Sequence, residues 1–66
     1  MTRAEFRKRV RRHFEGLNVQ FMLGEAEYLA SVTSSPESPV ITCQSSPYRD
    51  EISMFWHGRS IGLLSA

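Results

Sequence analysis

The sequence has a single cysteine, no long apolar run and no paired spacing of zinc-ligating side chains. Because Cys43 has no partner in the chain, no internal disulfide can brace the fold, and a reducing compartment suits the protein better than secretion. No stretch approaches the roughly 18 apolar residues of a membrane span. We therefore expect a cytoplasmic protein that does not associate with membranes. An Arg-rich start is also a feature of mitochondrial presequences, but Glu5 and Glu15 disfavour that alternative.

Catalytic patterns are missing as well. His13 and His57 do not stand with Cys43 at metal-site spacings, and Cys43 is expected to be a small buried hydrophobe. Residues 58–62 match the G-x-S-x-G nucleophile elbow, but the few residues after them hold no acid or base to complete a triad. A chain of 66 residues forms one domain, residues 1–66, which is too small for a deep catalytic cleft. We predict a protein that is not an enzyme and uses no cofactor.

What the sequence does have is an uneven distribution of charge. The net charge is only +1, yet residues 1–14 sum to +5 and residues 15–66 sum to −4. The two parts of the chain therefore differ strongly in potential, which bears on the choice of partner rather than on the fold. Six of the eight basic residues precede Phe14, and these are Arg3, Arg7, Lys8, Arg9, Arg11 and Arg12.

The basic segment is predicted to be a helix over residues 3–15. Thr2 followed three residues later by Glu5 is the pattern of a capping box, and Gly16 supplies a stop signal. Between them, apolar residues recur at a spacing of four and predict an amphipathic helix: Phe6, Val10 and Phe14.

Four of the six basic residues of the helix are predicted to point to the side opposite this apolar stripe. Their like charges repel at four-residue spacing, and a phosphate, an acidic partner or the chain's own acidic part would relieve the repulsion. The residues concerned are Arg7, Lys8, Arg11 and Arg12.

Residues 17–33 alternate between apolar and polar side chains and predict a hairpin of strands 17–23 and 26–33. A two-residue type II′ turn at Gly24 and Glu25 would make every inward pair apolar. In the alternative, the stretch forms one helix, which Gly24 in its middle would destabilise. The predicted inward pairs join Leu17, Val19, Phe21 and Leu23 to Val32, Ala30, Tyr28 and Ala26, respectively.

The rest of the chain predicts three further strands, residues 40–44, 51–57 and 60–64. Loops rich in Ser and Pro precede the first and second of them, and a second Gly-X turn, at Gly58 and Arg59, joins the last two. Phe55 falls on the polar side, at the sheet edge or exposed as a contact point. The fold class is thus α+β, an N-terminal amphipathic helix on an antiparallel sheet of four or five strands built from two hairpins. In the last hairpin, the residues predicted to face inward are Ile52, Met54, Trp56, Ile61 and Leu63, and Leu64 is predicted to face outward.

Two binding functions suit this scaffold. The first is a stoichiometric inhibitor that presents a rigid charged surface to a protein that handles nucleic acid. The alternative is weakly specific nucleic-acid binding through the Arg-rich helix. An exposed edge strand would also permit a homodimer instead of a monomer. The predicted partner-binding residues are Arg7, Lys8, Arg11 and Arg12 on the helix, and Glu25, Glu27, Asp50 and Glu51 in the acidic part.

A resemblance favours the first function. With TRAEFRKRVRRHF as its helix and Gly-containing turns at LGEA and HGRS, the chain resembles the small phage-encoded anti-CRISPR proteins in its general organisation. The resemblance implies a compact inhibitor that binds a Cas effector subunit in the host cytoplasm and blocks its DNA recognition.

Overall fold

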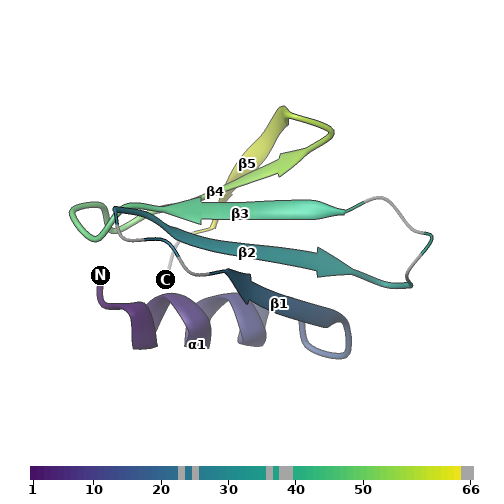
Figure 1. The fold of residues 1–66 in the computed structure, drawn as a ribbon, viewed down its shortest axis with the longest axis horizontal. Helices are drawn as coiled ribbons and strands as arrows, with labels where there is room; N and C mark the ends of the chain where they lie inside the picture. Colours follow the sequence, from purple (N-terminus) through teal and green to yellow (C-terminus); the bar gives the residue numbers. More distant parts are fainter. Residues whose placement is uncertain (23, 25, 36, 38–39, 65–66) are drawn as a thin grey trace.

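The structure, a computed structural model, describes residues 1–22, 24, 26–35, 37 and 40–64. In this part of the chain one helix is followed by a five-stranded antiparallel sheet in the order β1-β2-β3-β4-β5, and the helix packs against β1 and β2 (Figure 1). The predicted α+β class is confirmed, and the alternative of a single helix across residues 17–33 is wrong. The elements are α1 (Arg3–His13), β1 (Asn18–Met22), β2 (Tyr28–Thr33), β3 (Ile41–Ser45), β4 (Ile52–Trp56) and β5 (Arg59–Leu64).

Helix α1 begins as its capping box predicts. The Glu5 amide donates to the Thr2 hydroxyl at 3.2 Å, and the Thr2 amide donates to the Glu5 carboxylate at 3.4 Å. The helix ends at His13, two residues before the predicted end, because Phe14 already occupies the C-cap. Gly16 follows with a φ of +86°, the left-handed conformation expected of a glycine stop.

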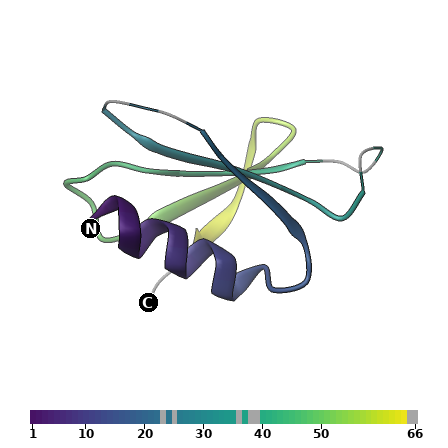
Figure 2. The ribbon, with the colours of Figure 1, turned by 60° about the horizontal axis from the view of Figure 1, so that its bottom comes forward.

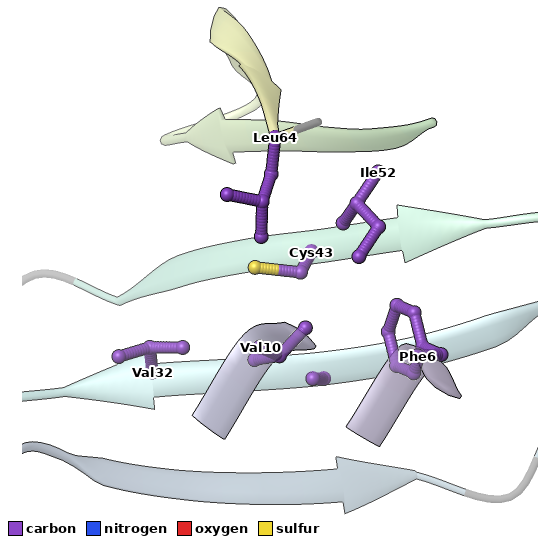
Figure 3. Close-up of a cluster of buried hydrophobic side chains, with 7 residues drawn as sticks. Phe6, Val10, Val32, Cys43, Ile52 and Leu64 are labelled. Carbon is purple, nitrogen blue, oxygen red and sulfur yellow. The ribbon is translucent and has the colours of Figure 1, made fainter. Parts of the chain in front are cut away.

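A single apolar cluster lies between α1 and the inner face of the sheet (Figure 3). Phe6 and Val10 point from the helix into this cluster and are almost completely buried. Burying a side chain of that size contributes roughly 1.5–3 kcal/mol, so these two residues hold the helix on the sheet. Strands β2 to β5 supply the other buried members, which are Ala30, Val32, Cys43, Ile52 and Leu64.

The first hairpin has the predicted faces but a different register. Val19 pairs with Val32 and Phe21 with Ala30, two residues away from the predicted pairing. A slip of two preserves the face of every side chain, so the alternation of the sequence cannot distinguish the two registers. The predicted two-residue turn at Gly24 and Glu25 is wrong, because β1 ends at Met22 and β2 begins only at Tyr28. The turn position Glu25 and the predicted inward residue Leu23 lie outside the described residues.

The chain folds back closely within this longer connection. A Cβ built on Gly24 would lie 2.2 Å from the carbonyl oxygen of Glu27, so only glycine fits. The longer connection also leaves two predicted inward positions, Leu17 and Ala26, outside the strands and exposed to solvent.

The second hairpin turns one residue earlier than predicted. Trp56 pairs with Arg59, so the turn residues are His57 and Gly58, with φ of 51° and 74°. Positive φ at both positions is the type I′ pattern, whose twist matches that of the strands, in place of the predicted type II′ turn. Histidine tolerates this conformation better than most residues.

A β-bulge then changes the faces of β5. Phe55 pairs with Ser60 and Met54 with Gly62, which leaves Ile61 as the extra residue. The predicted inward positions Ile61 and Leu63 are therefore wrong.

The bulge brings Leu64 to the buried position opposite Ile52 instead. Trp56 keeps the predicted inward position, opposite Ile41 on β3, but 43% of this residue is exposed at the end of β4, beside the His57 ring. Figure 2 shows α1 lying across one side of the twisted sheet, and no other element of the described residues covers the outward side of the helix.

Candidate functional site

Arginines of α1 form an ordered row along the sheet edge. The Cζ atoms of Arg7 and Arg11 lie 5.4 and 5.1 Å from the centroid of the Phe21 ring on β1. The prediction that they point away from the apolar stripe is therefore wrong. Each directly follows an inward residue, so it sits only about 100° around the helix from it, and its guanidinium group reaches over the ring.

Arg3 extends the row toward the connection between β1 and β2. Its Cζ lies 5.7 Å from the centroid of the Tyr28 ring, and its Nη2 donates to the Gly24 carbonyl at 2.9 Å. The space beneath Arg3 and Arg7 measures only about 10 Å³, the size of one water molecule. This space is too small for a ligand, so only the exposed sides of these arginines are accessible. We call Arg3, Arg7 and Arg11 the arginine surface.

The other basic residues of the helix point elsewhere. Lys8 and Arg12 are exposed on the outward side of α1. Arg9 turns to the opposite flank, where its Nη1 lies 3.3 Å from a carboxylate oxygen of Asp50. This is the only ion pair between described residues, so the chain's own acidic part neutralises one helix cation and leaves the arginine surface charged.

The acidic residues do not share one environment. Asp50 faces the helix through Arg9, whereas the Glu27 carboxylate accepts a hydrogen bond from the Gln44 side chain. Glu51 is exposed and its backbone carbonyl accepts from the Ser45 hydroxyl at 2.7 Å. Glu25, the fourth predicted acidic residue, lies outside the described residues.

A second candidate site lies on the outer face of the sheet, which the sequence pattern did not predict as a site. It is a hollow of about 360 Å³ beside the turn between β3 and β4. The one signal in the sequence was Phe55, a large aromatic residue at an outward-facing position. The hollow is lined by Glu27, Gln44, Ser45, Ser46, Arg49, Ser53 and Phe55.

Cys43 is part of the core, as expected, and is 1% exposed. Burial raises the pKa of its thiol to about 11, which keeps the sulfur protonated and unreactive at neutral pH. Among the described residues, no three His, Cys, Asp or Glu side chains come together as a metal site. The described part of the chain also has no helix whose length and apolar character would allow it to span a membrane.

No family model, curated protein or solved structure matches the chain. The choice between possible functions therefore depends on the two sites themselves, the arginine surface and the outer-face hollow.

Proposed function

We propose that this protein is a non-enzymatic nucleic-acid-binding protein whose arginine surface contacts the phosphate backbone. The observation that supports the proposal is the pair of guanidinium groups of Arg7 and Arg11 over one ring, Phe21. No carboxylate among the described residues pairs with either of them. Two unneutralised cations beside one ring repel each other, and a bound phosphate removes that repulsion.

The spacing of the row suits a linear polyanion. Arg3, Arg7 and Arg11 are four residues apart, so each step rises about 6 Å along the helix. Guanidinium groups form planar, bidentate hydrogen bonds to phosphate oxygens, and repeated charges on one line match a ligand that also repeats its charge. Lys8 and Arg12 on the outward side add to the field that attracts such a ligand.

The aromatic rings also restrict the arginine side chains before any ligand binds. A guanidinium over an exposed aromatic ring gains about 0.5–1 kcal/mol, which favours the stacked rotamer. Each side chain therefore loses less rotamer entropy on contact with phosphate. Because backbone contacts do not read sequence, binding through this surface is expected to be weakly sequence-specific.

A salt titration with labelled duplex DNA tests the proposal. Two single variants are compared, Arg7→Gln, and Arg59→Gln as a control of equal charge change outside both sites. Loss of one phosphate contact should lower the slope of log K against log salt by about 0.9 in the first variant and leave it unchanged in the control. Equal slopes for both variants, or no binding by the wild type at low salt, would contradict the proposal.

A second candidate is the stoichiometric inhibitor, of anti-CRISPR type, that the sequence resembles. The observation that favours it is the exposure of Glu27, Asp50 and Glu51, acidic residues outside the helix that a protein partner can contact. In this role the protein would block DNA recognition by a Cas effector subunit, in the cytoplasm of a phage-infected host.

The two candidates differ in a direct assay. An inhibitor suppresses DNA binding by the purified effector at one-to-one stoichiometry without binding DNA itself. Replacing Glu27, Asp50 and Glu51 with the corresponding amides should abolish that suppression, whereas suppression that survives these changes would argue against an acidic contact surface.

A further inference from the structure

We propose that the hollow on the outer face of the sheet is a binding site for a guanine base, distinct from the arginine surface. The hollow and the arginine surface share no residue, and they lie on opposite sides of the sheet. The site is formed by side chains from β3, β4, the turn between them and the residue before β2.

Phe55 supplies the surface on which a base can stack. It is half-buried, lies on β4 and is the only aromatic residue at an outward-facing position of the described strands. Its backbone carbonyl accepts from the Thr42 hydroxyl at 3.4 Å, which links it to the neighbouring strand. An aromatic ring on an open sheet face stacks well with the planar face of a nucleobase.

Glu27 and Gln44 select the base. The Gln44 amide donates to one oxygen of the Glu27 carboxylate, which orients both groups at the edge of the hollow. A carboxylate only accepts hydrogen bonds, and it can take two parallel N–H donors. Guanine alone among the common bases presents two adjacent donors, N1–H and N2–H, on its pairing edge. The remaining N–H of Gln44 can donate to the guanine O6.

The turn beside the hollow is held rigidly. The Arg49 amide donates to the Ser46 carbonyl at 3.0 Å and the Tyr48 amide donates to the Ser46 hydroxyl at 3.2 Å, with Pro47 at the second position of the turn. The Met1 nitrogen donates to the Arg49 carbonyl at 3.2 Å. This turn places Arg49, an exposed cation, at the wall of the hollow, where it suits the phosphate of a guanine nucleotide.

Calorimetric and NMR titrations with GMP and AMP test the assignment. The wild type is expected to bind GMP about tenfold more tightly than AMP, the size of preference that a paired hydrogen-bond contact gives. The oligonucleotides UUGUU and UUAUU then identify the source of the base. This comparison uses the Arg7→Gln with Arg11→Gln variant, so that phosphate contacts with the arginine surface do not contribute. In that variant, tighter binding of UUGUU than of GMP assigns the site to a strand, and equal or weaker binding assigns it to a free nucleotide. Equal affinity for GMP and AMP, or no binding of either, overturns the proposal.

Two matched pairs of variants locate the site. Glu27→Gln should reduce the preference for GMP to about twofold or less, whereas Glu37→Gln, another exposed glutamate, should leave it unchanged. Phe55→Leu should weaken both nucleotides about tenfold, whereas Val40→Ala should not, because this exposed apolar residue precedes β3 at the end farther from the hollow. The preference for GMP surviving Glu27→Gln would contradict the assignment.

The double variant Arg7→Gln with Arg11→Gln separates the two proposals. It should retain the full preference for GMP even if it no longer binds duplex DNA. Thermal unfolding of each variant shows whether the fold is intact.

Discussion

The two faces of the sheet differ in composition and in what covers them. The inner face is apolar and is covered by α1, with Phe6 and Val10 almost completely buried against β2 to β5. The outer face has no covering element in the described part of the chain and carries mostly polar side chains around Phe55 (Figures 1 and 2). A sheet needs only one buried face for stability, so the side chains of the other face are free to serve a ligand.

The arginine surface is the point where the two requirements meet. The guanidinium groups of its three arginines lie over Phe21 and Tyr28, at the edge of the inner face, and the three residues stay exposed to solvent. The same residues therefore contribute packing and charge. This difference between the faces can be tested by matched changes on each side.

The largest difference in unfolding free energy between an inner-face change and an outer-face change is expected for Phe6 and Phe55. Phe6→Ala should cost about 3–5 kcal/mol, which is close to the whole stability of a domain of this size, and leave the protein largely unfolded at 25 °C. Phe55→Ala should cost about 1 kcal/mol or less. Urea denaturation followed by far-UV circular dichroism measures both, and similar losses for the two variants would show that the faces contribute equally.

A loss of stability of intermediate size is expected at high pH, because Cys43 is buried on the inner face. Its pKa is raised from 9.0 to about 11 in the folded protein, so stability is complete below pH 9 and falls as the pH rises through 11, because only the unfolded chain releases the proton in that interval. The loss should be on the order of 2 kcal/mol. Urea midpoints between pH 8 and 11 measure it, with Cys43→Ala as the control. An equally steep fall in that variant would assign the effect to other groups.

The smallest difference in the loss of stability is expected between alanine variants of two threonines, Thr2 and Thr42. Thr2→Ala removes the N-cap that holds α1 and should cost about 1 kcal/mol. Thr42→Ala on the outer face removes one exposed hydrogen bond and should cost about 0.5 kcal/mol or less. Thermal unfolding separates the two, and a larger loss for Thr42 would mean that the outer face supports the fold after all.

The alternation of apolar residues was sufficient to predict the strands and most inward positions. It could not predict register, because a slip of two residues keeps Val19 and Phe21 on the same face. The turn at His57 and the bulge at Ile61 depend on backbone conformation, which leaves no period in the sequence, and the bulge reversed the predicted faces of β5.

The two candidate sites differ in how far they could be predicted from the sequence. Counting charges identified Arg7 and Arg11, but their contact with Phe21 required the position of β1 beside the helix. The outer-face hollow combines Glu27, Gln44 and Phe55, which are far apart in the sequence and meet only through the strand pairing. No local motif could indicate that combination.

The central claim is that phosphates contact the arginine surface and a guanine base contacts the outer-face hollow. Chemical-shift mapping with UUGUU and UUAUU tests this claim most directly. Both oligonucleotides should shift the amides of α1 near Arg7 and Arg11, since phosphate contacts do not depend on sequence. Only UUGUU should shift the amides of Gln44, Arg49 and Phe55 on the outer side. Shifts confined to one face, or outer-face shifts of equal size with both oligonucleotides, would contradict the account.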